Sequence, residues 1–338
     1  MSSPSLPGGA SIAVVVPCYR VTRHIEGVLA RVGAEVERIY CVDDACPEAS
    51  GDFIESRVVD PRVVVLRHPE NVGVGGAVMT GYRAAIDDGF DVIVKIDGDG
   101  QMDPRLLPGF VAPLLRGDAD YAKGNRFFDL SHIQRMPLVR RIGNLGLSFL
   151  AKLSSGYWDL FDPTNGYTAI HARVAERLPL HAISRRYFFE TDMLFRLGTL
   201  RAVVVDVPMD AVYDDEQSHL HVGRALVEFA WKHVRNFGKR ILYSYFLRDL
   251  SIASLELVAG LLLSAIALGF GGHHWLESIA TGRAAPTGTV MVAALCAISG
   301  LQFLLAFIGY DIANVPRRPL HPVLGRQPVV YRPPASAP

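Results

Sequence analysis

Two long stretches near the C-terminal end of this chain contain no Lys, Arg, Asp or Glu, and they constrain its fold more than any other feature. They run from Leu257 to Leu276 and from Ala284 to Tyr310. Each supplies the roughly 20 apolar residues that an α-helix needs to cross ~30 Å of hydrocarbon. We therefore predict transmembrane helices at 250–272 and 288–311, joined by an external loop at 273–287, rather than two buried core helices.

Basic side chains flank these stretches on one side. Arg283 is the only Lys or Arg between them, whereas several precede the first stretch or follow the second: Arg235, Lys239, Arg240, Arg248, Arg317 and Arg318. By the positive-inside rule, both chain ends lie in the cytosol and the loop lies outside. Residues 221–249 mix aromatic and basic side chains, which predicts an amphipathic juxtamembrane helix in the headgroup region. We expect a multi-pass protein of the cell (inner or cytoplasmic) membrane.

The first two thirds of the chain alternate short apolar strands with amphipathic helices. From Ile12 the order is IAVVV, a helix at 25–32, IYCVD, a helix near Phe53, VVVL, a helix at 74–86 and VIVKID. This alternation predicts an α/β domain with a parallel sheet covered by helices on both faces. Helices at 137–155 and 187–198 and a strand at 203–208 extend this domain over 11–220. We expect an N-terminal tail at 1–10 and a cytosolic C-terminal tail at 312–338. Packed structure should be absent from 1–10 and from the Pro-rich end of the second tail, 326–338.

Composition excludes several classes of protein. The formal net charge is zero, which gives no basic surface for nucleic acid. The scattered cysteines suggest neither a zinc site nor a disulfide framework, and we expect free thiols at Cys18, Cys41, Cys46 and Cys296. The histidines are interpreted as structural or solvated rather than as metal ligands: His219, His221, His273 and His274.

An acidic turn follows the strand VIVKID, with the sequence Asp97-Gly98-Asp99-Gly100-Gln101. Ligands of open α/β sheets gather beyond the carboxyl ends of the strands, where this turn lies. Mg²⁺ prefers oxygen ligands and often binds through carboxylates and substrate phosphates, so the turn could hold a nucleotide diphosphate. Taken alone the motif is weak, because acidic glycine turns are usually solvated loops.

Several motifs in order strengthen this interpretation, because together they resemble glycosyltransferase family 2, with the inverting GT-A fold, across about 11–215. The matching segments of its first half are VVVPCYR, VDDAC, HPENVGVGGA and DGDGQMDP. The resemblance implies nucleotide-sugar contacts from Pro17, Tyr19, Asp43, Asp44, Asn71, Gly76 and Asp97. It also implies that Asp99 and Gln101 bind Mg²⁺ or Mn²⁺. As a phosphate loop, the glycine cluster is weak, because it lacks the Walker lysine. A nicotinamide-dependent enzyme is a remote alternative, because the glycines follow the third strand and the turn after the first strand lacks the dinucleotide fingerprint.

The later motifs resemble the polyprenyl-phosphate glycosyltransferase or dolichyl-phosphate mannose synthase-like subgroup, which includes members with two C-terminal transmembrane helices. KGNRF and VPMDAVYDDEQSHLHVGR carry this resemblance together with DGDGQMDP, which is its most specific match, whereas DPTNGY and FFETD resemble acceptor-side motifs of the wider family. The resemblance implies that Arg126 binds a phosphate. It also brings a set of residues towards the sugar or the acceptor: Asp162, Asn165, Gly166, Glu190, Asp192, Ser218, Leu220 and Arg224.

The sequence thus predicts an inverting transfer of a hexose from UDP- or GDP-sugar to a polyprenyl phosphate of undecaprenyl or dolichyl type, as in cell-envelope glycan synthesis. The expected catalytic residues are Asp97, Asp99, Arg126 and Asp192. A second hypothesis is a family 2 enzyme that glycosylates a hydroxyl of a lipid-linked glycan, with Asp192 as general base. A third is a non-catalytic membrane scaffold with a decayed nucleotide-binding fold. The sugar, the nucleotide base and any homo-oligomeric state are left open.

Overall fold

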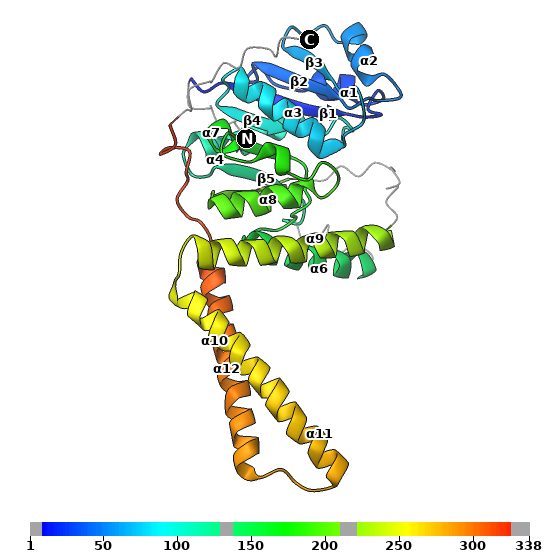
Figure 1. Ribbon diagram of the computed structural model, residues 1–338. Helices are drawn as coiled ribbons and strands as arrows, with labels where there is room; N and C mark the ends of the chain where they lie inside the picture. Colours follow the sequence, from blue (N-terminus) through cyan, green and yellow to red (C-terminus); the bar gives the residue numbers. More distant parts are fainter. Residues whose placement is uncertain (1–8, 129–137, 210–221, 326–338) are drawn as a thin grey trace, which may run out of the picture. The chain divides into compact units, whose positions relative to one another are not determined.

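A computed structural model describes residues 9–128, 138–209 and 222–325, and the chain divides into two compact units (Figure 1). The first unit comprises Met1–Asn236 together with Pro316–Pro338, and the second is Phe237–Val315. The division falls within the predicted juxtamembrane helix. Residues 1–8 and 326–338 of the two predicted tails lie outside the described residues.

The first unit is built on a sheet that has seven strands over the described residues, in the order β3-β2-β1-β4-β6-β5-β7. The strands are β1 (Ile12–Cys18), β2 (Arg38–Asp43), β3 (Val63–Arg67), β4 (Val92–Lys95), β5 (Tyr121–Asn125), β6 (Thr168–His171) and β7 (Val204–Pro208). β6 runs antiparallel to both β4 and β5, whereas the other pairs are parallel. The parallel arrangement predicted from the alternation is confirmed for β1 to β4. β6, which the sequence did not predict, follows α6 (Leu138–Ser155) and the loop at 156–167 and makes the whole sheet mixed, because it lies antiparallel between β4 and β5.

Helices cover both faces of the sheet, as predicted. They are α1 (Ile25–Leu29), α2 (Ser50–Arg57), α3 (Val74–Asp87), α4 (Leu107–Leu115), α6 (Leu138–Ser155), α7 (Ala172–Ala175), α8 (Phe189–Leu200) and α9 (Val222–Leu242), with 3₁₀ turns at Pro104–Leu106 and Leu180–Ala182. Alternate β1 side chains explain the two layers. Ile12, Val14 and Val16 join a core with residues of α1, α2 and α4, whereas Val15 faces α3.

The segment that follows the second unit returns to the sheet domain. Asp120, which is fully buried, accepts hydrogen bonds from the backbone N–H groups of Leu320 and His321, each at 2.9 Å. Arg173 Nη1 donates to the carbonyl oxygens of His321 and Leu324, both at 3.3 Å. The first part of the predicted cytosolic tail is therefore packed. The contact joins residues 200 positions apart, which local sequence patterns do not report.

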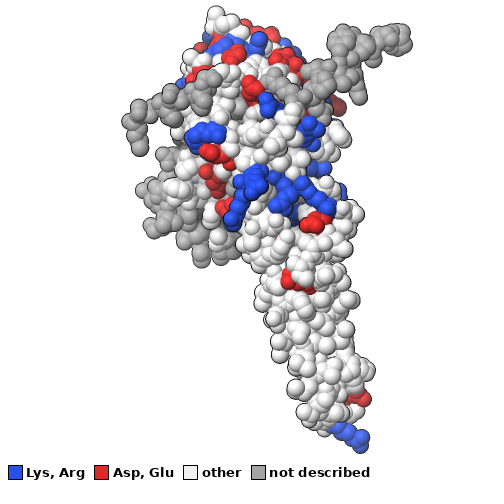
Figure 2. All heavy atoms as spheres, turned by 90° about the vertical axis from the view of Figure 1, so that its left-hand side faces the viewer, with Lys and Arg blue, Asp and Glu red and all other residues white. Residues whose placement is uncertain are grey.

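The second unit is a helical hairpin. It contains the end of α9, a π-helical turn (Tyr243–Leu247), α10 (Ile252–Ile266), a second π-helical turn (Ala267–Gly271), α11 (Gly272–Thr281) and α12 (Thr287–Ala313). Ile252–Thr281 and Thr287–Ala313 are, within the described residues, two helices long and apolar enough to cross a membrane. The predicted loop at 273–287 is helical as far as Thr281, so the non-helical connection is only 282–286. On the face shown in Figure 2, charged side chains are sparse along the hairpin.

Polar contacts nevertheless lie inside the hairpin. Arg240 and Asp311 form a buried two-pronged ion pair, with Nη1–Oδ1 at 2.7 Å and Nη2–Oδ2 at 3.0 Å. Tyr245 donates to the same carboxylate at 2.5 Å. Further along the hairpin, a Cβ at Gly300 would lie 2.8 Å from Ser264 Oγ, so glycine lets α10 and α12 approach closely.

Candidate active site

The acidic turn directly follows β4 at the carboxyl end of the sheet. The Asp97 side chain is about a quarter exposed, and Asp99 and Gln101 are half-buried. Gln101 donates its backbone N–H to Asp99 Oδ1 at 3.0 Å, which closes the turn. Carboxylate and amide oxygens from these residues form the hard donor set that Mg²⁺ or Mn²⁺ prefers.

Lys95 is a site residue that sequence reasoning missed. Its side chain is 1% exposed, and its Nζ lies 2.7 Å from Asp97 Oδ1. The same Nζ is 4.0 Å from Glu190 Oε1 and 5.4 Å from the centre of the Phe189 ring. A buried ammonium is tolerated only beside such partners. The available signal was a lysine within the otherwise apolar strand VIVK.

Glu190 begins α8 and lies beside the Lys95–Asp97 pair. Burial raises the pKa of Glu190 to about 7, although the nearby Lys95 ammonium acts in the opposite direction. A Cβ at Gly166 would overlap Lys95 Nζ and lie 2.7 Å from Asp97 Oδ2. The structure therefore brings Asp97, Gly166 and Glu190 together, and glycine leaves the space that the ion pair occupies.

Arg126 forms a two-pronged ion pair with Asp162. Nε lies 2.7 Å from Oδ2 and Nη2 lies 2.7 Å from Oδ1. Burial favours the neutral carboxyl, but the Arg126 contacts outweigh it and hold the pKa of Asp162 below its usual range. Asn165 is 2% exposed and donates to Asp162 Oδ2 at 3.1 Å. Asn165 thus orients Asp162, and Asp162 orients the Arg126 guanidinium.

Lys123 is a second buried lysine that the sequence analysis did not single out. Its Nζ contacts Asp206 Oδ1 at 2.9 Å and donates to the carbonyl oxygen of Phe161 at 2.5 Å. Asp206 Oδ2 accepts the backbone N–H of Phe161 at 2.7 Å. These bonds hold the loop that carries Asp162, so Lys123 positions the Arg126 pair from below.

Asp43 and Asp44 follow β2, and their carboxylates hold loops. Asp43 accepts from the backbone N–H groups of Cys46 and Gly51 at 2.8 and 2.7 Å. Asp44 accepts from the N–H groups of Val72 and Gly73 at 2.9 and 2.8 Å, ahead of α3.

Three more of the predicted nucleotide contacts are Asn71, Pro17 and Tyr19, and His68 lies just before the first of them in the chain. His68 contacts Asp44 Oδ1 at 2.8 Å, and Asn71 donates its side-chain amide to the carbonyl oxygen of Asp44 at 3.1 Å. Pro17 is half-buried at the end of β1 and Tyr19 is 45% exposed just beyond it. Direct nucleoside contact by Pro17, Tyr19, Asp43, Asp44 and Asn71 stays a prediction.

The glycine cluster at the start of α3 packs against the loop at 184–186. Gly76 donates its N–H to the carbonyl oxygen of Arg185 at 3.2 Å. A Cβ at Gly75 would overlap the carbonyl oxygen of Ser184. Residues 184–186 therefore make a close approach to these glycines, and a contact of Gly76 with the nucleotide sugar stays a prediction.

Asp192 is 3% exposed, and both of its oxygens are taken. Oδ2 accepts the backbone N–H of Ser184 at 2.9 Å, and Oδ1 accepts the side-chain amide of Asn236 at 2.9 Å. This arrangement links α8 to α9 and to the 184–186 loop, and it favours a positioning role over a general base. Ser218, Leu220 and the side chain of Arg224 lie outside the described residues.

Comparison with known proteins gives consistent similarities. The Glycosyl transferase family 2 model matches residues 13–178. An undecaprenyl-phosphate mannosyltransferase from Micrococcus luteus is 31% identical over 205 residues, which cover 60% of this chain and 83% of that protein. A UDP-N-acetylglucosamine–dolichyl-phosphate N-acetylglucosaminyltransferase from Methanococcus voltae is 25% identical, with 60% of this chain and 86% of that protein covered. Glucosyl-3-phosphoglycerate synthase from Mycobacterium tuberculosis, crystallised with Mg²⁺ and UDP, shares the fold, with a TM-score of 0.50, 18% identity and coverage of 69% and 79%.

Proposed function

Because this chain belongs to glycosyltransferase family 2, we propose that it moves a hexose from a UDP- or GDP-linked sugar to the phosphate of a polyprenyl lipid, with inversion at the anomeric carbon. It is a glycosyltransferase with a GT-A sheet domain, which leaves the scaffold hypothesis without support. The observation that carries the proposal is the acidic turn Asp97–Gln101. Its oxygen donors lie beside Lys95 and Glu190 at the ligand edge of the sheet.

The choice of a lipid phosphate as acceptor is supported by what two similar proteins share. The names of the Micrococcus and Methanococcus proteins give different sugars, mannose and N-acetylglucosamine, but both give a polyisoprenoid phosphate as acceptor. The acceptor class is thus the shared property. The hexose and the nucleotide base stay open, because the two similar proteins are named for different sugars.

The reaction needs little proton transfer. An oxygen of the acceptor phosphate attacks the anomeric carbon as the bond to the donor diphosphate breaks on the opposite side. A phosphate monoester is anionic at neutral pH and needs no general base, so the protein's tasks are to position the reactants and to balance charge. The fully engaged carboxylate of Asp192 is consistent with this acceptor and disfavours the hydroxyl-acceptor hypothesis. The guanidinium of Arg126, oriented by Asp162, is suited to contact phosphate oxygens.

A divalent cation fits the donor set of the acidic turn. Asp99 and Gln101 would bind Mg²⁺ or Mn²⁺, which would neutralise the charge on the departing diphosphate. Asp97 lies nearby but is paired with Lys95 at 2.7 Å, so its carboxylate is partly neutralised by the chain itself. We therefore assign Asp99 as a metal ligand and Asp97 as the ion-pair partner of Lys95.

The proposed location is the cytosolic face of the cell membrane, with α10–α11 and α12 as the spans. The backbone contacts of Leu320 and His321 with Asp120 support this topology. These contacts are consistent with a hairpin that crosses the membrane and returns, so that the residues after α12 would lie on the same side as the sheet domain. We retain the division into a catalytic domain at 11–220, a juxtamembrane helix and a hairpin as part of this proposal.

An assay with two acceptors tests the function. Purified enzyme in liposomes would receive radiolabelled UDP- or GDP-hexose with either bare polyprenyl phosphate or a pyrophosphate-linked oligosaccharide. We expect label on the bare phosphate. Label on the oligosaccharide alone, together with complete loss of turnover in Asp192→Asn, would contradict the proposed acceptor.

A further inference from the structure

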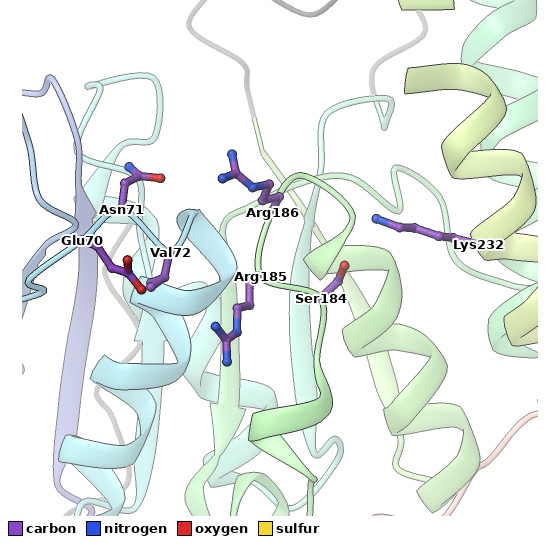
Figure 3. A pocket seen from close by; sticks show the side chains of 7 residues that line it. All are labelled: Glu70, Asn71, Val72, Ser184, Arg185, Arg186 and Lys232. Atoms are coloured by element: carbon purple, nitrogen blue, oxygen red, sulfur yellow. The ribbon is translucent and has the colours of Figure 1, made fainter. Parts of the chain in front are cut away.

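A cationic cavity lies beside the candidate active site, between the start of α3 and the loop that precedes α8 (Figure 3). Its volume is about 390 Å³, and it is lined by Glu70, Asn71, Val72, Ser184, Arg185, Arg186 and Lys232. In Figure 3, Lys232 extends from α9 towards the loop that carries Ser184, and Asn71 lies on the opposite side. None of the basic residues belongs to the predicted site.

Positive charge dominates this lining. Arg185 and Arg186 are exposed, and neither guanidinium makes a hydrogen bond or ion pair with another described residue. Lys232 is paired with Glu228 at 2.7 Å, with its side chain 23% exposed. Glu70 is the acidic residue of the lining. Figure 3 shows the Arg185 and Arg186 side chains extending in opposite directions from their loop, so they spread positive charge along the edge of the cavity, and this charge favours an anionic ligand.

The wall that carries these guanidinium groups is held in place from both sides. On one side, Gly76 donates its N–H to the carbonyl oxygen of Arg185. On the other, Asp192 accepts the N–H of Ser184 and the side-chain amide of Asn236, which ties the loop to α9. The cavity is thus part of the folded framework rather than a gap beside a loose loop.

The cavity also lies close to the reacting groups. Arg186 precedes Glu190 by one turn, and Glu190 lies 4.0 Å from Lys95 Nζ. A Cβ at Gly75 would overlap Ser184 on the cavity wall and lie 2.6 Å from Phe189 Cβ. The loop that forms this wall therefore leads directly into Phe189 and Glu190, which contact Lys95, the partner of Asp97 in the acidic turn.

The helix that supplies Lys232 has an apolar outer stripe. Val227, Trp231 and Val234 are 72%, 67% and 57% exposed and share one face at i, i+4 and i+7 spacing. The opposite stripe, with His233 and Asn236, is buried at 1% exposure each. Lys232 lies on the flank between these stripes. A cationic cavity next to exposed Trp and Val suits a ligand with a charged head and an apolar chain.

We propose that this cavity receives the phosphate of the lipid acceptor, which is attracted by the positive charge of Arg185, Arg186 and Lys232 along its lining. The inference rests on the proposed function, and it adds a binding site to it. A nucleotide is a poorer match, because Val72 is the only apolar side chain among the described lining residues and no aromatic ring is present to stack on a base. The isoprenoid chain would instead lie along the outer stripe of α9.

Steady-state kinetics of the full-length enzyme in liposomes test this site, with a purified short-chain polyprenyl phosphate as the probe. The double variant Arg185→Gln/Arg186→Gln should raise the KM for polyprenyl phosphate by about ten- to a hundredfold, as expected for losing two charge-assisted contacts. The KM for the nucleotide sugar should change by less than about twofold. Lys232→Gln should show a smaller rise, and Arg185→Lys/Arg186→Lys should recover part of the affinity.

Arg57→Gln is the matched control, because Arg57 is an exposed arginine of α2 in the same unit. It should leave both KM values unchanged. An unchanged acceptor KM in the double variant would overturn the inference. So would a rise confined to the nucleotide-sugar KM, which would assign the cavity to the donor, or weaker binding to anionic vesicles without a change in acceptor KM. A wild-type enzyme that never glycosylates polyprenyl phosphate would instead contradict the proposed function itself.

Discussion

The sheet domain buries its apolar side chains, whereas the hairpin exposes side chains of the same types. Val14 in β1 is 0% exposed, whereas Val292 in α12 is 49% exposed. Leu261 and Leu262 of α10 are likewise more than half exposed, at 56% and 59%. A water-soluble protein does not leave so continuous an apolar surface uncovered. The difference indicates that the two units are adapted to different solvents, the hairpin to lipid and the sheet domain to water.

Polar groups show the reverse contrast. The sheet domain buries lysines and carboxylates in groups that meet at the ligand edge, such as Lys95 with Asp97 and Lys123 with Asp206. Within the described hairpin, the buried charged groups are Arg240 and Asp311. Buried charge builds a site in one unit and joins helices in the other. The following predictions test this division, from the largest effect to the smallest.

The largest effect is expected for Asp99→Ala, because this change removes a proposed metal ligand. Transfer activity should fall at least about a thousandfold, or ~4 kcal/mol of transition-state stabilisation. Membrane retention after alkaline extraction should not change, since insertion depends on the hairpin. Asp118→Ala, at an exposed residue paired with Arg116, is the control that should keep full activity. Wild-type turnover of the Asp99 variant in the presence of a chelator would contradict the metal role.

Breaking the buried hairpin pair should be nearly as costly for stability. Arg240→Met leaves the Asp311 carboxylate buried without its partner, at an expected cost of about 3–5 kcal/mol. The double variant Arg240→Met/Asp311→Leu should be far less destabilised, because both charges are removed together. The folded fraction after heating in detergent, followed by size-exclusion chromatography, measures both. Equal losses in the single and double variants would show that the pair is not the stabilising contact.

A matched pair of valine truncations probes the solvent difference directly. Val14→Ala should destabilise the sheet domain by about 2 kcal/mol, because it opens a cavity in a close-packed core. Val292→Ala should cost less than about 0.5 kcal/mol in detergent or lipid, where the exposed side chain only exchanges one apolar neighbour for another. Thermal unfolding of the two variants compares them. Similar costs at both positions would argue that the hairpin is a protein core.

Glu190, in the sheet domain, should make the stability of the folded protein depend on pH. Its folded pKa of about 7 lies above the ordinary value of 4.5, so the folded state holds this proton more tightly. The resulting stability is fully present below about pH 4.5 and is lost as the pH rises through 7. Glu190→Gln should remove this loss and stabilise the protein at pH 8 by about 1–2 kcal/mol relative to wild type. Melting temperatures at pH 5.5 and 8 provide the test, and an unchanged pH dependence would contradict it.

Asp192→Asn should have the smallest effect on catalysis. The amide can keep one of the bonds to Ser184 and Asn236, so we expect a stability loss of about 1 kcal/mol. Turnover should stay within about tenfold of wild type. Complete inactivation of a folded variant would restore Asp192 as a general base.

The sequence predicted those features that local patterns encode. Apolar periodicity indicated β1 to β4, β7, α3 and α8, and the charge-free runs indicated both hairpin helices. The same approach missed β5 and β6, because strands of five and four residues in polar surroundings give no clear alternation. The acidic turn was evident from its motif.

Other parts of the site depend on contacts that only folding creates. The Gly75–Gly76 segment also packs against Ser184 and Arg185, more than a hundred residues later in the chain, and its sequence gives no sign of that contact. Asp192 suggested a base from its motif, yet two long-range hydrogen bonds occupy it. The packing of His321 on Asp120 joins the two sequence segments of the first unit, which the hairpin separates in the chain. Neither segment alone predicts this contact.

The most direct test of the account is the mass of the lipid product. Purified enzyme would be incubated with bare polyprenyl phosphate, Mg²⁺ and each of a panel of UDP- and GDP-hexoses. One donor should convert the lipid into a species that has gained one hexose and still carries a single phosphate. No mass gain with any donor, or a product with two phosphates, which would indicate transfer of a sugar phosphate, would contradict the account.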